Sequence, residues 1–315
     1  MASPLALLKD ERVVRLRTRL IAWWEGKDIE AGGPLVLTEA AMAPPPALSP
    51  RVEALVHLWG EGRFGPAEAG QEADWMAALA ARTDETLALL SPTGGAQLKA
   101  MAGQRKGRLE AYEWRDSQFA PLTEAAARLE GASCSVHPLG IDGAGLKPRL
   151  GGLVSNEELA YCPDVAVFAK AVHKALKKGS GAVFETYCTE ALDADWSGAF
   201  SVADAEPKIR NVLALRTALS QAGFTILSEE DRSRTLANAA RAAFARFSAS
   251  MQENPAILAP AALQELAWES ECWRVRLKLL GNGTLLRYRF VTVKPKIAPP
   301  PLGSISQART IVAAH

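Results

Sequence analysis

Short apolar runs and longer amphipathic stretches alternate along this chain of 315 residues. Runs of about four to eight apolar residues bounded by turn residues are typical of buried strands. The strands predicted in this way are residues 87–90, 108–113, 133–137, 150–155, 182–187, 224–227 and 285–293. The last of these follows a Gly-Asn-Gly turn, which favours a strand that returns antiparallel at the edge of the sheet.

Apolar positions spaced three and four apart predict the helices. The predicted helices are residues 10–25, 51–59, 72–81, 165–178, 207–222, 232–251 and 261–280. Gly179 is expected to end the helix 165–178, and Pro207 and Gly223 are expected to bracket the helix 207–222. From residue 86 onward strands and helices alternate, which is typical of an α/β fold with a mostly parallel sheet covered on both faces.

The pattern also predicts how the chain is divided. Residues 1–41 carry the N-terminal amphipathic helical segment, and residues 42–50 contain four prolines and predict a linker. Residues 51–294 form the main domain, with a helical cap at 51–82 and a helical insertion at 232–280. The proline-rich residues 295–315 are expected to be a loosely held tail.

Composition and charge argue against several classes of function for this protein. A formal net charge of +1 gives no electrostatic reason to expect nucleic acid or an anionic membrane surface as the partner. No apolar stretch is long enough to span a membrane, and scattered cysteines without a CxxC pair fit a reducing compartment, so the cytoplasm is expected. Cys134 and His137 would point to opposite faces of a strand, so no metal site is predicted.

Four passages, in order, resemble one known family. Residues 58–69 read LWGEGRFGPAEA, residues 174–187 read KALKKGSGAVFETY, residues 219–231 read LSQAGFTILSEED, and residues 273–295 read WRVRLKLLGNGTLLRYRFVTVKP. Together they resemble the small-molecule class I methyltransferases that use S-adenosylmethionine, over roughly residues 55–294. The resemblance implies a Rossmann-like seven-stranded sheet whose last strand is antiparallel, and S-adenosylmethionine as the cofactor.

The donor-binding segment of that family departs from its pattern here. The family's acidic residue and its three glycines fall on Leu89, Ser91, Thr93 and Gly95, so that Gly95 is the one glycine retained, with Gly94 beside it. A side chain in place of glycine restricts the backbone angles and occupies ligand space. The family's ribose-binding acidic residue is matched by Glu113. The resemblance therefore implies a degenerate cofactor site at Ser91, Gly94, Gly95 and Glu113, although Glu113 is equally readable as a solvent-facing strand end.

The resemblance also implies substrate-facing residues. Asn156, Glu157 and Tyr161 follow the fourth predicted strand and would face the reacting methyl group, and Trp59 of the cap would line the substrate side. The alternatives are that Glu157 and Glu158 begin a short helix and serve its dipole, and that Trp59 belongs to the core. Methyl transfer from a sulfonium is driven largely by alignment, so no general base is required and no catalytic residue is assigned.

Two functions remain open on the sequence. One is a methyltransferase-fold protein with an eroded S-adenosylmethionine site, weakly active or non-catalytic, that acts through a ligand pocket or a protein partner. The alternative is an active S-adenosylmethionine-dependent methyltransferase on a small molecule. A nucleic-acid methyltransferase is disfavoured by the balanced charge and by the absence of an Asn-Pro-Pro type motif. In either case the cap and insertion are expected to cover the carboxyl ends of the strands, with the pocket beneath them.

Overall fold

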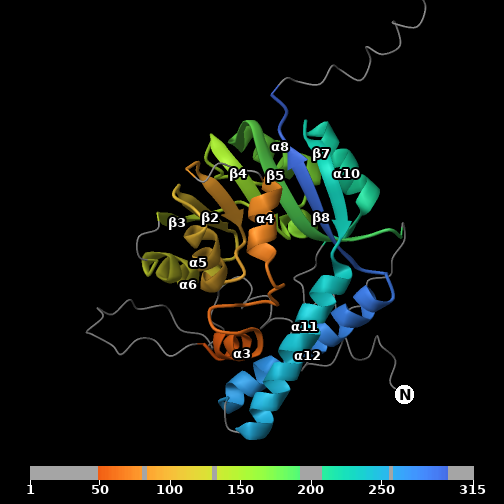
Figure 1. Ribbon diagram of the computed structural model, residues 1–315. Helices are drawn as coiled ribbons and strands as arrows, with labels where there is room; N and C mark the ends of the chain where they lie inside the picture. Colours follow the sequence, from red (N-terminus) through yellow and green to blue (C-terminus); the bar gives the residue numbers. More distant parts are fainter. Residues whose placement is uncertain (1–48, 80–83, 130–132, 192–207, 255–257, 297–315) are drawn as a thin grey trace, which may run out of the picture.

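The computed structural model describes residues 49–79, 84–129, 133–191, 208–254 and 258–296 (Figure 1). The predicted helix at 10–25, nearly all of the linker at 42–50 and almost all of the tail lie outside the described residues. Of the linker, Ser49 and Pro50 are described, and both belong to the start of the first helix, α3, where the Ser49 hydroxyl accepts a hydrogen bond from the Val52 amide at 3.3 Å.

The described residues form one eight-stranded sheet with the order β3-β2-β1-β4-β5-β8-β7. The two-residue strand β6 pairs with the end of β5. The strands are β1 (Leu87–Leu90), β2 (Leu109–Glu113), β3 (Cys134–Pro138), β4 (Leu150–Asn156), β5 (Leu176–Thr189), β6 (Arg210–Asn211), β7 (Thr225–Asp231) and β8 (Leu286–Val293). β8 runs antiparallel to both of its neighbours, and the remaining pairs are parallel. The α/β class and the antiparallel last strand are as predicted, and the sheet has one strand more than the seven expected, because the short β6 pairs with β5.

The expected position of the last strand at the edge is wrong. β8 pairs with β5 on one side and with β7 on the other, so that β7 forms the edge. The long helices before β8 allow this arrangement, because they carry the chain away from β7 and return it to the gap beside β5. The residues of β8 are therefore mostly buried, whereas those of β7 are mostly exposed.

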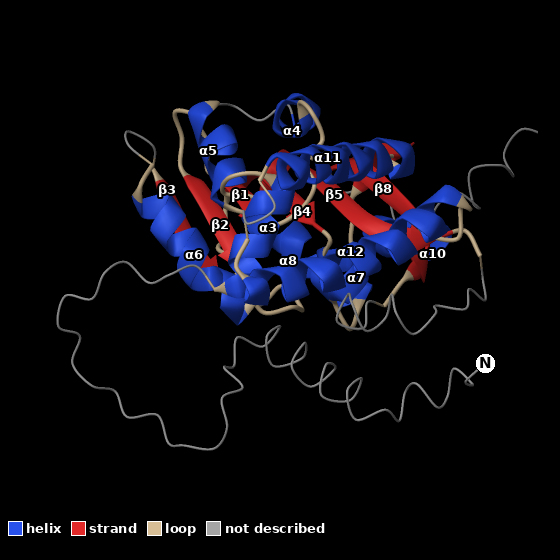
Figure 2. Cartoon of the chain, turned by 90° about the horizontal axis from the view of Figure 1, so that it is seen from below, coloured by secondary structure: helices blue, strands red, loops and turns tan. Residues whose placement is uncertain are grey.

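Helices cover both faces and one end of the sheet (Figures 1 and 2). They are α3 (Pro50–Trp59), α4 (Gln71–Leu79), α5 (Gly95–Gly103), α6 (Asp116–Ala127), α7 (Glu158–Tyr161), α8 (Val165–Ala175), α10 (Val212–Gln221), α11 (Ser233–Glu253) and α12 (Pro260–Gly281). Successive side chains of a strand point to opposite faces, so Leu87 and Leu89 join the core beneath α4 and α5, while Leu90 joins the core beneath α8 and α10. A parallel sheet buried on both faces explains the continuous apolar runs in the sequence.

A third apolar core joins the cap to the insertion. Trp59 of α3 makes edge contacts with Phe244 of α11 and Trp273 of α12, at ring-centroid distances of 5.6 and 5.1 Å. The same core includes Ala160, just after β4, and Tyr187, near the end of β5. The insertion and α3 of the cap therefore lie at the carboxyl ends of the parallel strands, as the sequence predicts, whereas α4, the second helix of the predicted cap, packs on a face of the sheet. Trp59 itself is buried in this core.

Two predicted helix boundaries are wrong. The helix expected at 165–178 ends at Ala175, because the chain enters β5 at Leu176, which pairs with Leu150 and whose carbonyl accepts a hydrogen bond from the Lys294 ammonium. The helix expected from Pro207 starts at Val212, where the Asn211 side chain caps it by accepting from the Leu213 amide at 2.8 Å. Residues 210–211 pair with β5 instead.

Candidate functional site

The loop after β1 holds Ser91 in an unusual backbone conformation. Ser91 has φ +46°, in the left-handed region that favours glycine, while its amide donates to the Tyr112 carbonyl of β2 at 2.8 Å. A non-glycine residue held there costs about 1 to 3 kcal/mol. The backbone thus keeps the turn for which the resembling family uses glycine, although the residue has changed.

The other polar requirements of this loop are met from within the chain. Leu89 is fully buried in the core with Leu98 and Val154, so that its position carries packing and no charge. The Thr93 amide donates to the side-chain Oε1 of Gln97 at 2.9 Å, and the Ala96 amide donates to a loop carbonyl at 3.1 Å. These two amides of the loop and the helix start are therefore already used.

Gly94 and Gly95 are required by close packing. A Cβ on Gly94, which has φ +122°, would lie 2.1 Å from the carbonyl oxygen of Gly62, and a Cβ on Gly95 would lie 2.5 Å from the Cβ of Ala125. Both approaches are with the protein itself: Gly94 meets the loop 60–66, and Gly95 meets α6. The cofactor role that the resemblance implies for these two glycines stays a prediction.

Glu113, at the end of β2, is locked in an ion pair. Arg115 Nε donates to Oε1 at 2.7 Å and Arg115 Nη2 donates to Oε2 at 2.8 Å, while the Arg115 amide also donates to Oε1 at 2.8 Å. The Glu113 side chain is fully buried. The reading of Glu113 as a solvent-facing strand end is therefore wrong. Both of its oxygens, which in the resembling family would accept the ribose hydroxyls, already accept from Arg115.

The end of β4 carries a second strained residue. Glu157 has φ +82°, and its carboxylate accepts from Arg287 at 2.9 Å. The Asn156 amide group bridges β1 and β8, because Nδ2 donates to the Ser91 carbonyl at 3.2 Å and Oδ1 accepts from Arg287 at 2.9 Å. Strained residues at the ends of neighbouring strands, Ser91 and Glu157, indicate a functional edge of the sheet. The short helix α7 begins one residue after Glu157, whose side chain makes no capping bond.

Glu158 is the buried acid of this edge. It is fully buried, and its Oε2 accepts from the Ser155 hydroxyl at 2.6 Å. Burial raises the pKa of Glu158 to about 7, and the hydrogen bond from Ser155 only partly offsets that rise. This group therefore changes charge near neutral pH.

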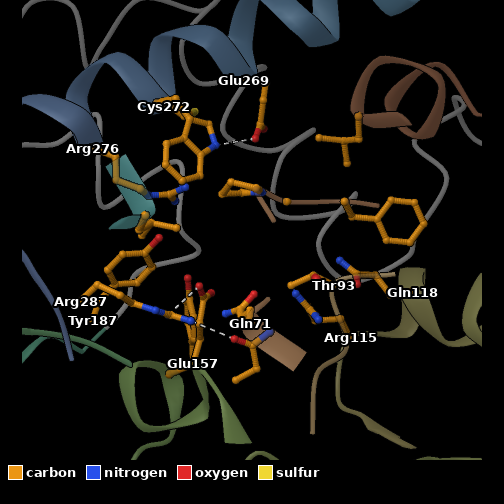
Figure 3. A pocket seen from close by; sticks show the side chains of 18 of the residues that line it. Gln71, Thr93, Arg115, Gln118, Glu157, Tyr187, Glu269, Cys272, Arg276 and Arg287 are labelled. Carbon is orange, nitrogen blue, oxygen red and sulfur yellow. Dashed lines mark hydrogen bonds and ion pairs between the residues drawn. The ribbon is translucent and has the colours of Figure 1, made fainter. Parts of the chain in front are cut away.

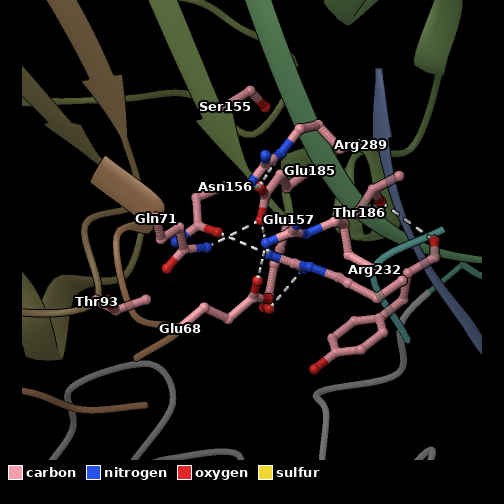
Figure 4. A network of polar contacts seen from close by, with 12 residues as sticks. Glu68, Gln71, Thr93, Ser155, Asn156, Glu157, Glu185, Thr186, Arg232 and Arg289 are labelled. Carbon is pink, nitrogen blue, oxygen red and sulfur yellow. Dashed lines mark hydrogen bonds and ion pairs between the residues drawn. The ribbon is translucent and has the colours of Figure 1, made fainter. Parts of the chain in front are cut away.

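Glu185, on β5, is the centre of a buried polar network that sequence reasoning missed (Figure 4). Its carboxylate accepts from Trp75 Nε1 at 2.6 Å, from Gln71 Nε2 at 3.0 Å, from Arg289 Nε at 2.7 Å and from Arg287 Nη2 at 3.2 Å. Burial raises the pKa of Glu185, but the charges of Arg287 and Arg289 and the hydrogen bonds from Trp75 and Arg289 together outweigh burial, and the net direction is down. In the sequence these partners lie about a hundred residues from Glu185, and Glu185 itself stands in an apolar strand without a local signal.

A cavity of about 130 Å³ opens between these strand ends and the cap (Figure 3). Its wall combines charged, amide and aromatic side chains with a few apolar ones. The lining residues are Arg51, Leu55, Phe64, Gly65, Pro66, Gln71, Thr93, Arg115, Gln118, Asn156, Glu157, Tyr161, Tyr187, Leu236, Glu269, Cys272, Trp273, Arg276 and Arg287.

The cavity collects some of the predicted site residues and not others. Asn156, Glu157 and Tyr161 line it, as does Thr93 of the β1 loop. Trp59, Ser91, Gly94, Gly95 and Glu113 do not line it. Trp59 supports it from behind through Trp273, and Glu113 reaches it through Arg115. The arginines of the cavity wall were missed, since they come from α3, the end of β2, α12 and β8 and share no motif.

Metal ligands and membrane spans do not emerge from the described residues. No group of three or more His, Cys, Asp or Glu residues in that part of the chain could hold a metal ion. Among the helices described here, none has the length and apolar character needed to cross a membrane.

Comparison with known proteins gives the fold. No protein-family model matches the chain, and no curated protein matches it significantly. Among solved structures, it is similar to phosphoethanolamine N-methyltransferase 2 of Haemonchus contortus bound to phosphomonomethylethanolamine and S-adenosylhomocysteine, at a TM-score of 0.65 and 14% identity, covering 79% of this chain and 61% of that one. The chain thus spans about three fifths of that neighbour's length.

Two further neighbours are matched along more of their own length. Geranyl diphosphate C-methyltransferase of Streptomyces coelicolor A3(2) matches at a TM-score of 0.55 and 15% identity, covering 72% of this chain and 76% of that one. The [4+2]-cyclase SpnF matches at 0.58 and 12%, covering 80% of this chain and 98% of that one. The fold is therefore that of the class I S-adenosylmethionine-dependent small-molecule methyltransferases.

Proposed function

We propose that this protein uses the methyltransferase fold as a small-molecule binding scaffold and has an eroded S-adenosylmethionine site, so that it methylates weakly or not at all. The observation that carries the proposal is the Glu113–Arg115 pair. A ribose diol can bind Glu113 only if the arginine is displaced from a buried, bidentate ion pair. Such charge-assisted pairs are among the strong hydrogen bonds of proteins.

Three further features support the same reading. Leu89 places an apolar side chain where the resembling family has its acidic residue. The amides of Thr93 and Ala96 are taken by Gln97 and by the loop 60–66. The cavity of about 130 Å³ is smaller than the roughly 300–1,000 Å³ of typical small-molecule sites. A ligand of the size of S-adenosylmethionine would require the loop and Arg115 to move.

The fold itself does not require methyl transfer. One neighbour of the same fold is a [4+2]-cyclase, although other neighbours are bound to S-adenosylmethionine or S-adenosylhomocysteine. Function therefore depends on the residues of the site. The second candidate, an active small-molecule methyltransferase, is favoured by the retained Glu113 and by a cavity at the strand ends where the donor and substrate would meet.

Donor binding decides between the two. Calorimetric titration of the full chain with S-adenosylmethionine and S-adenosylhomocysteine is expected to give a Kd weaker than about 100 micromolar, which corresponds to roughly 5.5 kcal/mol. Arg115→Ala frees both oxygens of Glu113 at a cost in stability, because the buried carboxylate loses its partner, and we expect it to tighten the binding of both ligands by about tenfold or more. Restoring Leu89→Asp would be a poorer test, since it would bury a carboxylate in the core.

The matched control is Arg128→Ala, which removes an exposed arginine at the other end of α6. It should leave donor binding unchanged, and thermal melting should show that all variants are folded. Tight donor binding by the wild type, unaffected by Arg115→Ala, would refute the eroded site and favour the active methyltransferase.

A further inference from the structure

The wall of the cavity contains Arg115, whose guanidinium is only partly used by hydrogen bonds within the protein. Arg115 uses Nε and one N–H of Nη2 on Glu113, and its main-chain amide also binds Glu113. Among the described residues, Nη1 has no hydrogen-bonding partner, and Arg115 lines the cavity. Guanidinium has a second fork, formed by Nη1 and Nη2, that matches the two oxygens of an oxyanion. The pair with Glu113 therefore aims a fixed fork at the cavity.

Two neutral polar side chains lie beside this fork. Figure 3 shows Thr93 and Gln118 next to Arg115 at one end of the cavity, and both line it. The Thr93 amide is used by Gln97, but its hydroxyl makes no hydrogen bond to another described residue. Gln118 Oε1 is buried without a hydrogen-bonding partner among the described residues, and an amide can turn to offer its nitrogen instead. Both groups can donate to an oxyanion held by Arg115.

The charges around Arg115 select among oxyanions. Arg115 is already paired with Glu113, and Glu157 and Glu158 also act on it electrostatically. One additional negative charge can be accommodated by the open fork, whereas a dianion would add a second charge close to these three carboxyl groups. A carboxylate is therefore favoured over a phosphate.

The remainder of the cavity wall at this end favours a flat apolar body. The Phe64 amide donates to the Thr93 carbonyl at 2.8 Å, and Phe64 lines the cavity. Tyr161 also lines the cavity and contacts Trp114, whose ring lies 5.8 Å from the Arg115 guanidinium carbon. The small volume admits only a compact ligand. Aromatic rings next to an arginine fork suit a short acid with an unsaturated or aromatic body.

We propose that the cavity binds a small monocarboxylic acid with a flat apolar body, whose carboxylate is held by the Nη edge of Arg115 with Thr93 and Gln118. This rests on the proposed function in that the ligand takes the place of the methyl donor. Arg115 covers the carboxylate that would bind the ribose diol, and its own guanidinium becomes the group that binds an acid. Glu113 acts here as a positioning residue, since it orients Arg115 and does not itself touch the ligand.

The test uses benzoate as the probe, with benzamide as its neutral counterpart and inorganic phosphate as the competing oxyanion. Chemical-shift titration of the full chain at constant ionic strength is expected to give a Kd at or below about 1 mM for benzoate. Benzamide and phosphate should each bind at least about tenfold more weakly. Absence of benzoate binding, or equal binding of benzamide, would overturn the proposal, and tighter binding of phosphate would overturn the carboxylate assignment.

Two variants place the binding on Arg115. Arg115→Lys keeps the charge and loses the fork, and the double variant E113Q/R115Q removes both charges, so that no lone carboxylate is buried. Each should weaken benzoate binding by about tenfold or more. Arg128→Gln, on the exposed end of α6, is the matched control and should leave it unchanged. Benzoate binding that survives both Arg115 variants would overturn the site.

The outcome is separable from that of the proposed function. Tight binding of S-adenosylmethionine by the wild type would refute the eroded donor site, whatever the result with benzoate. Weak donor binding together with benzoate binding that ignores Arg115 would refute only the acid site. The Arg115→Ala variant should gain S-adenosylhomocysteine binding and lose benzoate binding, so benzoate should not displace S-adenosylhomocysteine from it.

Discussion

Two buried arginine–carboxylate clusters lie toward the carboxyl ends of the parallel strands, and they have different roles. Glu113 and Arg115 are two residues apart, and Arg115 faces the cavity with an unused guanidinium edge. Glu185 is paired with arginines more than a hundred residues away, on β8, and its oxygens are fully taken by four side chains. The first cluster leaves capacity for a ligand, and the second leaves none.

The second cluster joins α4 to β5 and β8, two strands that already pair with each other. Gln71 and Trp75 come from α4, Glu185 from β5, and Arg287 from the antiparallel β8. The adjoining pair of Glu68 with Arg232, at 2.6 Å, ties the loop before α4 to the start of α11. A buried network in which the central carboxylate of Glu185 is fully hydrogen-bonded specifies how the cap meets the sheet. The comparison therefore separates an ion pair that is available for ligand binding from a network, centred on Glu185, that stabilises the fold.

The largest expected effect is a loss of stability when the network around Glu185 is disrupted. Glu185→Gln removes the charge that two buried arginines share, and breaking a buried pair costs about 3 to 5 kcal/mol of folding free energy. Urea denaturation at pH 7 should show that loss. Because the pKa of Glu185 is lowered on folding, its contribution is present above about pH 4.5 and disappears as the pH falls through the folded pKa. The deficit should shrink in acid.

The matched control is Glu271→Gln, which removes an exposed carboxylate paired with Arg274 on α12. Exposed pairs contribute about 0 to 1 kcal/mol, so its effect should be small. If Glu185→Gln were as mild as Glu271→Gln, Glu185 would not hold the sheet and cap together, and the contrast with the Glu113 pair would fail.

The second effect is a gain in stability, and it comes from replacing Glu158. Its folded pKa of about 7 exceeds the ordinary value of 4.5, so the folded state binds the extra proton and loses stability as the pH rises from about 4.5 to about 7. Glu158→Gln removes this titration and can still accept from Ser155. At pH 8 the variant should be more stable by on the order of 3 kcal/mol, at 1.36 kcal/mol per pKa unit.

The check is urea denaturation of both proteins between pH 4.5 and 8.5. The difference should be close to zero at the acid end, grow toward pH 7 and stay constant above it. A difference that is the same at every pH would show that Glu158 is not protonated in the folded protein near neutrality.

The sequence predicted the sheet because its signal is local. The run LALL at 87–90 marks a strand and the Gly223 turn marks a helix end within a few residues, whereas Gly179 lies inside β5 and did not mark the end of α8. α6 was missed because Pro121 interrupts its pattern, and the start of α10 was misplaced because the cap is Asn211 and not Pro207. The place of β8 in the sheet depends on pairing with β5 and β7, which no local pattern encodes.

The site was predicted unevenly for the same reason. Glu113 could be found by its position after a strand, but its partner Arg115 changes what the carboxylate can do, and a two-residue spacing does not reveal a bidentate pair. Glu185 carries no local signal at all, since its partners come from α4 and β8. Long-range polar contacts therefore set the chemistry that the sequence left open.

The smallest expected effect concerns Ser91, which tests whether the donor loop or the Arg115 pair disables the site. Relief of its left-handed backbone by Ser91→Gly gains about 1 to 2 kcal/mol and costs about 0.5 to 1 kcal/mol in chain entropy, so the free energy of unfolding should rise by about 0.5 to 1 kcal/mol. Ser228→Gly in the exposed strand β7 has only the entropic cost and should lower it by about 0.5 to 1 kcal/mol. Because Ser91 does not line the cavity, benzoate binding should be unchanged. Ser91→Gly should also leave S-adenosylhomocysteine binding weak, since Arg115 still covers Glu113. Strong recovery of that binding in calorimetry would shift the cause of the loss from the ion pair to the loop.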